Sequence, residues 1–411
     1  MSSRWFAPLL LLAAFLGWAT AMLTGTEHWM FASTQIVQNA FLAALKMIIA
    51  PLIFFSLISG ILQMRNAATL GKLGSTTLFY YLGTSAIAIV IGLSVVFFIH
   101  PWTNSPPLQD IPPPPDGLLS NSDGSLLTLF NGLLADMLSN PFAALAQTNI
   151  LGILTSAILI GLAAAAVLPK DSTWPDLLNQ LTQVIYKIAG WVILCLPIGM
   201  FAISFQLSHK IEMSTLVSLG QFAGVVVGAT LLHGLVVLPM LAWLLTGTRP
   251  INLLTQIGQP LLTAFVTSSS AATLPVSIKT AQEKLNVPAP KAAFILPLGA
   301  TMNMDGTALF EGIAVIFLAY MFNIELTTTS IIVVFFVAML ASAGAPGIPS
   351  GSMSGLQVVL IAVGIPLEAI ALLLLIERPL DTIRTAVNVE GDLIGSLIVH
   401  QFTSPNEGVP S

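Results

Sequence analysis

The sequence predicts an all-α polytopic membrane protein, and three observations support that prediction. Only 8% of the 411 residues are charged and 55% are hydrophobic, whereas about a quarter of the residues of a soluble domain are charged. The mean hydropathy is +0.91 over the whole length, so the apolar character is not confined to one anchor. Stretches of about 20 apolar residues, the length of a membrane-spanning helix, recur along the chain.

Six of these stretches are expected to cross the bilayer as simple helices. They cover residues 5–23, 40–62, 78–99, 150–168, 185–205 and 216–245. The first could instead be a secretory signal, because Arg4 precedes an apolar core and residues 19–21 fit a cleavage site. Its apolar run continues to Leu23, however, which is long enough to span.

The second half of the chain is equally apolar but interrupted. Polar and Gly/Pro clusters occur at 267–275, 299–307 and 342–354. Irregular backbone at membrane depth needs protein or a water-filled cavity to satisfy its N–H and C=O groups. The interruptions therefore predict an internal site.

The same half contains a repeat. Residues 253–278 and 330–363 each have the pattern of a helix, a small-residue tip and a second short helix, and the long helices expected at 292–320 and 366–398 follow them. A hairpin and a long polar helix, repeated from opposite sides, are typical of the inverted repeats of secondary transporters.

Lys and Arg residues outside the apolar segments predict the orientation, because they favour the cytoplasmic side. The residues expected on that side are Arg4, Arg65, Lys72, Lys170, Arg249, Lys279, Lys284 and Lys291. Loops 24–37 and 102–128 contain no Lys or Arg, and the latter is expected to be extended and exposed. We therefore expect a multi-pass protein with both termini in the cytoplasm. The absence of a basic run argues against nucleic acid as a partner.

The last helix carries a row of polar residues. Glu377, Asp381, Arg384, Asn388 and Asp392 are spaced by four, three, four and four residues and so share one helix face. A charge at the centre of a membrane helix costs about 2.5 to 3.5 kcal/mol. One alternative is a structural ladder in which Asp381 and Arg384 neutralise each other. Three acids against one base leave the row anionic, which favours a role in binding cations.

The preceding long helix is expected to unwind at Asn303-Met-Asp-Gly-Thr307, because Asn, Asp and Gly are poor helix formers. Freed carbonyls and the Asp305 carboxylate are hard oxygen ligands that suit an alkali cation. The triplet Ser268, Ser269 and Ser270 fits the capped N-terminus of a half-helix, which suits a substrate carboxylate or serves only as a cap.

Three long motifs resemble one known family, the dicarboxylate/amino acid:cation symporters, or glutamate transporters. The motifs are Phe265-Val-Thr-Ser-Ser-Ser-Ala-Ala-Thr-Leu-Pro275, Pro297-Leu-Gly-Ala-Thr-Met-Asn-Met-Asp-Gly-Thr307 and Asp381-Thr-Ile-Arg-Thr-Ala-Val-Asn-Val-Glu-Gly-Asp392. Residues 46–56 and 80–85 are similar too, so the resemblance covers nearly the whole chain.

The resemblance implies a homotrimer of transport units, each with eight transmembrane helices and two re-entrant hairpins, that work by an elevator motion. Residues 1–250 would form mainly the scaffold and trimerisation helices, with the third span contributing to the transport core. Residues 251–400 would form that core, and 401–411 a cytoplasmic tail. The expected location is the plasma membrane, such as a bacterial inner membrane.

The resemblance also implies roles for individual residues. Arg384 would hold the substrate side-chain carboxylate, Asp381 its amino group, and Asn388 with Ser268, Ser269 and Ser270 its main-chain carboxylate, while Thr307, Gly347 and Thr385 line the pocket. One sodium site would use Gly299, Asn303, Asn388 and Asp392; another Tyr81, Thr84, Ser85, Asn303 and Asp305; and a third the backbone of Thr301, Met304, Ser342 and Ala345.

Some positions depart from the family pattern or have open roles. Family members often carry a second arginine where this chain has Ser268 or Thr382. In the tip of the second hairpin, Pro346 and Ser350 stand where the family more often has small residues or Gly. Arg378 is expected to be a snorkelling or scaffold residue.

Glu311 resembles the proton carrier of proton-coupled members, and burial disfavours the charged form of such a carboxyl group. The alternative is a structural glutamate without a transport role.

Together these features predict a cation-coupled importer of glutamate or aspartate, driven by sodium, protons or both, with no prosthetic cofactor and no enzymatic activity. A C4-dicarboxylate importer is the first alternative. An intramembrane hydrolase is the second, although Gly351-Ser-Met-Ser-Gly355 does not fit a nucleophile motif. The sequence leaves open the coupling ion, potassium counter-transport and the preferred amino acid.

Overall fold

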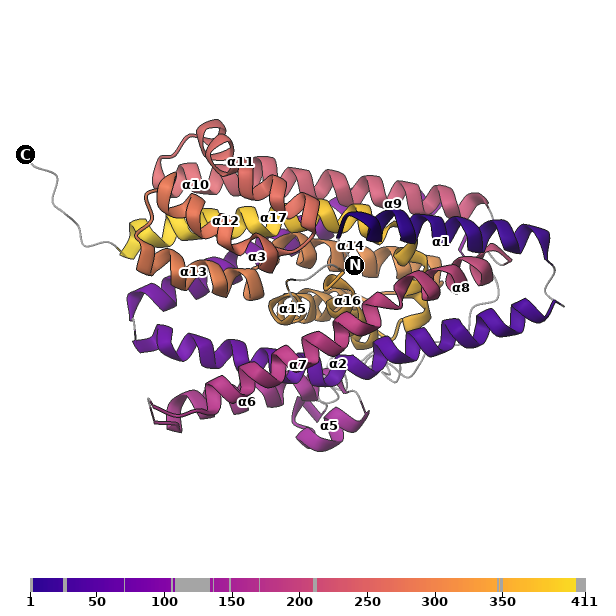
Figure 1. The fold of residues 1–411 in the computed structure, drawn as a ribbon, viewed down its shortest axis with the longest axis horizontal. Helices are drawn as coiled ribbons and strands as arrows, with labels where there is room; N and C mark the ends of the chain where they lie inside the picture. Colours follow the sequence, from indigo (N-terminus) through magenta and orange to yellow (C-terminus); the bar gives the residue numbers. More distant parts are fainter. Residues whose placement is uncertain are drawn as a thin grey trace, which may run out of the picture.

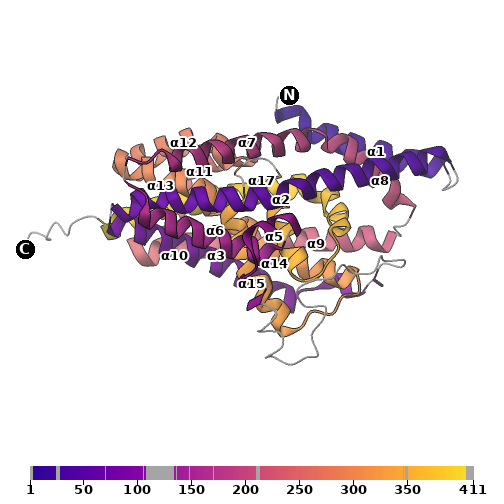
Figure 2. The same cartoon turned by 90° about the horizontal axis from the view of Figure 1, so that it is seen from below.

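The computed structural model describes residues 3–24, 28–69, 71–104, 106–107, 134–135, 137–147, 149–169, 171–209, 213–345, 347 and 350–403. All regular elements in these residues are helices. Most of them run along the long axis of an elongated bundle (Figure 1), and the view from below shows the same arrangement (Figure 2).

The first four predicted spans are helices. They correspond to α1 (Ser3–Leu23), α2 (Trp29–Thr69), α3 (Lys72–Phe98) and α6 (Ile150–Val167). The described residues between α3 and α6 include the short elements η1 (Pro101–Asn104) and α5 (Pro141–Gln147). The loop at 102–128 was expected to be exposed, but its first residue, Trp102, is buried against Phe222 and Phe317. Its residues 108–128 lie outside the described part.

The span predicted at 185–205 is not one continuous helix. The segment is divided between α7 (Trp174–Leu194) and α8 (Leu196–Ser208), which meet at an angle of 48°. Pro197 has no N–H to continue the hydrogen bonding of α7, which accounts for the break. The predicted span at 216–245 is continuous but includes a π-helical turn: α9 (Met213–Leu232), η2 (His233–Val237) and α10 (Leu238–Thr246).

The second half has the predicted order of hairpin, broken helix, hairpin and long helix. Its elements are α11 (Pro250–Thr267), α12 (Ser270–Glu283), α13 (Ala289–Met302), α14 (Asp305–Met321), α15 (Thr328–Gly344), α16 (Ser352–Ala362), η3 (Leu367–Ala369) and α17 (Ile370–Thr403). The predicted unwinding occurs at Asn303 and Met304, whose ψ angles of 88° and 59° are not helical. Ser269 caps α12 by accepting a hydrogen bond from the Ala272 N–H.

The long helix α17 is the centre of the second half. It packs against α3, α9, α10 and all four helices from α11 to α14. By contrast, α1 packs mainly on α8, and α2 packs mainly on α6, α7 and α8. The division at residue 250 stays a prediction, and the packing of α9 and α10 on α17 adds these helices to the surroundings of the site.

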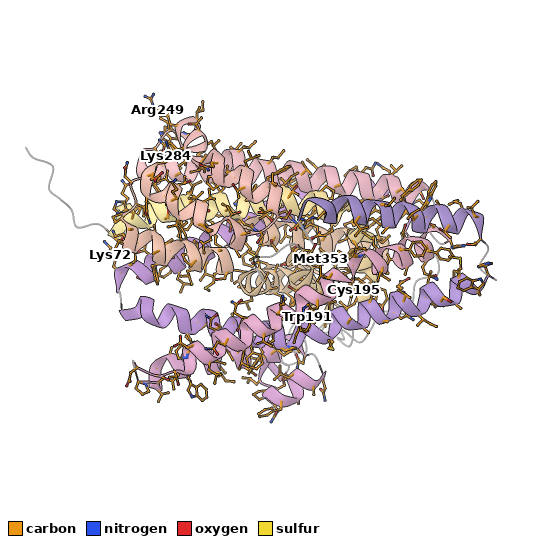
Figure 3. All side chains as sticks on the ribbon, viewed as in Figure 1. Lys72, Trp191, Cys195, Arg249, Lys284 and Met353 are labelled. Atoms are coloured by element: carbon orange, nitrogen blue, oxygen red, sulfur yellow. The ribbon has the colours of Figure 1, made fainter. Side chains whose placement is uncertain are left out.

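Length and composition identify three described helical stretches that could each cross a membrane: Lys72–Asn104, Ser214–Thr246 and Ala289–Met321. The bent pair of α7 and α8 would make a fourth. The count of eight transmembrane helices therefore stays a prediction. Figure 3 shows Lys72, Arg249 and Lys284, all expected in the cytoplasm, near the same end of the molecule.

Candidate functional site

The polar row of α17 lies inside the protein. Glu377, Asp381, Arg384, Asn388 and Asp392 are all buried. The hydrogen bonds of Asp381 and Arg384 reach the tip of the second hairpin, and those of Asn388 and Asp392 reach the break between α13 and α14. Two of the three irregular segments therefore meet along one face of α17, and α12, which follows the tip of the first hairpin, packs on α17 as well.

Arg384 is the most enclosed charge of this row, with 1% of its surface exposed. Its Nη2 donates to Glu377 Oε1 at 2.6 Å and to Ser352 Oγ at 3.0 Å. The guanidinium carbon also lies 3.8 Å from the centre of the Phe310 ring. Its Nε and Nη1 have no partner within the described part of the chain. Since a buried donor without a partner is costly, these two groups are available for an anionic ligand.

Asp381 links α17 to the second hairpin. Its Oδ2 accepts a hydrogen bond of 2.9 Å from the backbone N–H of Ser350, at the hairpin tip. Its Oδ1 lies 3.5 Å from Arg384 Nη2. A carboxylate with both oxygens engaged in this way has a fixed orientation.

The two hairpin tips touch each other. The carbonyl of Gly347 accepts hydrogen bonds from the Ser269 hydroxyl, at 2.8 Å, and from the Ala271 N–H, at 3.1 Å. Ser268 and Ser270 are buried beside this contact, and the Ser268 hydroxyl has no partner among the described residues. The three serines and Gly347 are therefore brought together.

Asn388 connects α17 with the start of α14. Its Oδ1 accepts from the Gly306 N–H at 2.8 Å, and its Nδ2 donates to Thr307 Oγ1 at 3.3 Å. Thr385, one turn before Asn388, is also buried. All nine residues expected around the substrate thus lie on or beside α17 and the two tips.

The residues expected around sodium form a second, adjoining network of oxygen atoms. Asn303 accepts from the Thr84 hydroxyl at 3.2 Å and donates to Asp392 Oδ1 at 3.1 Å. Asp305 Oδ1 accepts from the Ser85 hydroxyl at 2.9 Å. Hydroxyl, amide and carboxylate oxygens are the donor set that a hard cation prefers.

Tyr81 is placed differently from the other members of its expected set. Its hydroxyl donates to the Ile295 carbonyl at 2.8 Å, and a side chain added at Gly299 would meet both this hydroxyl and Asp392 Oδ1. Tyr81 therefore lies nearer to the set containing Gly299 and Asp392. The residues of the third set, Thr301, Met304, Ser342 and Ala345, lie on α13, on α15 and at their ends, and these two helices pack together.

Glu311 lies on α14, completely buried, and neither carboxyl oxygen has a partner among the described residues. A side chain at Gly355, on α16, would meet Glu311 Oε1. The carboxyl group therefore lies against the second hairpin.

The structure adds residues to the site that the sequence did not suggest. Arg378 is buried and does not snorkel, and its Nη1 lies 3.5 Å from Asp381 Oδ2. Its expected contact with the scaffold stays a prediction. His233 also joins the site, because its Nε2 lies 3.2 Å from Asp305 Oδ2. The spacing of three residues between 378 and 381 was the signal available for Arg378.

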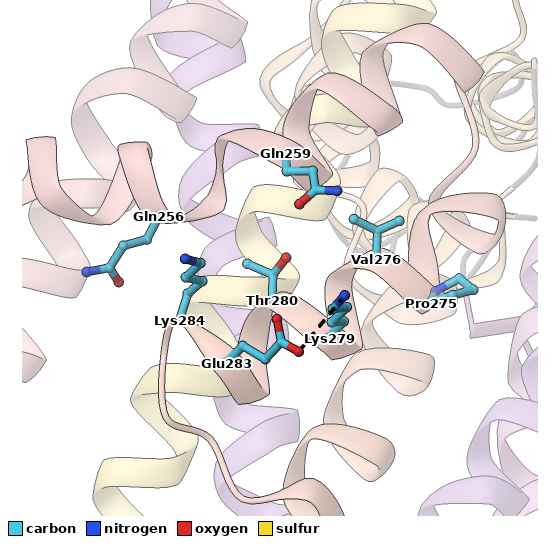
Figure 4. Close-up of a pocket in the computed structure, with 8 residues that line it drawn as sticks. All are labelled: Gln256, Gln259, Pro275, Val276, Lys279, Thr280, Glu283 and Lys284. Carbon is cyan, nitrogen blue, oxygen red and sulfur yellow. Dashed lines mark ion pairs between the residues drawn. The ribbon is translucent and has the colours of Figure 1, made fainter.

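A surface pocket of about 310 Å³ lies between α11 and α12 and contains none of these residues. Figure 4 shows its lining, which includes the Lys279 and Glu283 pair at 4.0 Å. Its exposed charges have the character of a solvated surface and not of the buried site.

Comparison with known proteins gives a consistent match. Residues 6–402 match the family described as the sodium:dicarboxylate symporter family. An excitatory amino acid transporter of Caenorhabditis elegans is 31% identical over 400 residues, covering 87% of this chain and 79% of the relative.

Two mammalian relatives are named for different substrates. Human excitatory amino acid transporter 3 is 28% identical over 454 residues, covering 98% of this chain and 86% of the relative. The bovine neutral amino acid transporter B(0) is 32% identical over 402 residues, covering 90% and 74%. A match of this extent shows that the chain is a membrane-embedded transport protein that belongs to the sodium:dicarboxylate symporter family.

Proposed function

We propose that this protein imports acidic amino acids, glutamate or aspartate, across the plasma membrane, and that sodium, protons or both drive the uptake. The observation that carries this proposal is that Nε and Nη1 of the buried Arg384 have no partner among the described residues. Each of these nitrogens can donate a charge-assisted hydrogen bond to a carboxylate oxygen, and the guanidinium supplies the opposite charge. An apolar substrate side chain would leave both donors unpaired.

The transport cycle we propose is an elevator motion within a homotrimer. The main packing of α1 on α8, and of α2 on α6, α7 and α8, supports a scaffold, while α3 and α9 to α14 pack on α17, which carries the site. In the same proposal the Asp305 and Asp392 networks each hold a coupling cation, and the contact between the hairpin tips closes the pocket.

A C4-dicarboxylate importer is the alternative that the family description favours. The two proposals differ at Asp381, which can pair with the amino group of an amino acid but repels a ligand with two carboxylates. The second alternative, an intramembrane hydrolase, is set aside because the chain belongs to a family of transporters.

Asp381→Asn separates these alternatives. The substitution keeps an oxygen for the Ser350 N–H but removes the charge, so aspartate binding should weaken by about 10- to 100-fold, the equivalent of a charged hydrogen bond. Succinate binding should stay equal or improve. Competition binding to the purified protein measures both. Wild-type protein that takes up succinate as well as aspartate in direct competition would refute the amino acid assignment.

We further propose that Glu311 carries a proton during transport. The burial of both carboxyl oxygens, with no hydrogen-bond partner in the described part of the chain, supports this role, because burial disfavours the charged form of a carboxyl group.

Glu311→Gln should therefore preserve substrate binding and exchange but make net uptake insensitive to an imposed pH gradient. Uptake into proteoliposomes measures this effect, and Glu283→Gln on the exposed end of α12 is the matched control. Wild-type uptake that already ignores the pH gradient would show that the carrier role is wrong.

A further inference from the structure

Arg378 is a second buried arginine beside the substrate pocket. Only 7% of its surface is exposed, so its guanidinium does not reach the surface as a snorkelling side chain would. We infer that Arg378 is a positioning residue that sets the charge of the pocket, and thereby the net charge of the ligand that the pocket accepts. This inference rests on the proposed function, because it concerns the same site.

The ion pairs of α17 form one chain. Arg378 pairs with Asp381 at 3.5 Å, Asp381 pairs with Arg384 at 3.5 Å, and Arg384 pairs with Glu377 at 2.6 Å. Two bases and two acids make this chain neutral when all four are charged. Without Arg378 it would carry one net negative charge, directly where an anionic ligand has to bind.

Arg378 and Arg384 contact different oxygens of Asp381. Arg378 Nη1 and the Ser350 N–H both approach Oδ2, whereas Arg384 approaches Oδ1. Arg378 therefore acts through Asp381: it fixes the carboxylate beneath the tip of the second hairpin and offsets its charge. The free donors of Arg384 then remain available to the ligand and are not drawn toward an unneutralised Asp381.

A charge near a binding site affects ligands in proportion to their own charge. Succinate carries two net negative charges, aspartate one and serine none at neutral pH. Removing the Arg378 charge should thus weaken succinate most, aspartate less and serine least, by roughly tenfold for each unit of ligand charge. A purely structural role for Arg378 would weaken all three equally.

The test is competition binding of succinate, aspartate and serine to the purified full-length protein. Arg378→Gln should give losses in the order succinate, aspartate, serine, and Arg378→Lys should recover most of the affinity because it restores the charge. Arg249→Gln makes the same substitution at an exposed position and should change nothing. Size-exclusion elution verifies that each variant folds.

Equal losses for all three ligands, or undiminished succinate binding in Arg378→Gln, would overturn the inference. The wild-type measurements test the proposed function separately. Preference for succinate would refute the amino acid assignment, but the order of affinity losses in Arg378→Gln could still be measured.

Wild-type protein that binds serine alone would refute acidic transport, and the inference would then require serine binding to survive Arg378→Gln. Loss of serine binding in that variant would overturn it.

Discussion

Arg384→Cys should abolish the uptake of glutamate and aspartate and admit serine or alanine instead. The substitution removes the only guanidinium in the described structure whose buried Nε and Nη1 are both unpartnered. Breaking one side of a buried charge pair costs about 3 to 5 kcal/mol, which corresponds to more than a hundredfold in affinity. Uptake of labelled aspartate and serine by the same proteoliposomes measures both effects.

Two further variants separate this role from damage to the surroundings. Arg384→Lys keeps the charge without the planar array of donors and should recover little aspartate affinity. Glu377→Gln combined with Arg384→Cys removes the glutamate charge that would otherwise be stranded. Aspartate affinity that is unchanged in Arg384→Cys would contradict the assignment.

Asp392→Asn should raise the sodium concentration needed for half-maximal aspartate binding by tenfold or more. The reason is that the carboxylate, held by the Asn303 amide at 3.1 Å, neutralises the cation in the proposed site. Weaker cation binding lowers substrate affinity by reciprocal linkage. Sodium titrations of aspartate binding measure the shift.

Gly299→Ala offers an independent approach to the same site. Its new side chain would meet Asp392 Oδ1 and the Tyr81 hydroxyl, so the same increase in sodium requirement is expected while every charge is retained. Gly258→Ala, at an α11 position where an added side chain meets nothing, is the matched control. Aspartate binding that needs no sodium in the wild type would refute sodium coupling and leave protons as the driver.

Most of the helices could be predicted from the sequence because apolar length and breaker residues are local signals. Asn303 and Met304 leave the helix where an Asn-Met-Asp-Gly run weakens it, and Ser269 caps the half-helix as expected. The break between α7 and α8 was missed because Pro197 stands in an uninterrupted apolar stretch. The π-helical turn at His233 depends on packing against α17 and has no comparable local signal.

The site was predictable where spacing along one helix was sufficient. The row from Glu377 to Asp392 is buried, as the cost of exposing such charges to lipid requires. Which acid pairs most closely with Arg384 was not predictable: the spacing favoured Asp381, but Glu377 lies nearer, at 2.6 Å. Asp305 has two partners, Ser85 and His233, which lie 220 and 72 residues away from it in sequence. Spacing along one helix could not predict such distant contacts.

The most direct test of the account is uptake of labelled glutamate, aspartate and succinate into proteoliposomes under separately imposed sodium and proton gradients. The account predicts accumulation of glutamate or aspartate that requires at least one of these gradients, with succinate clearly weaker. Accumulation of succinate in preference to both amino acids, or equilibration that neither gradient alters, would contradict it.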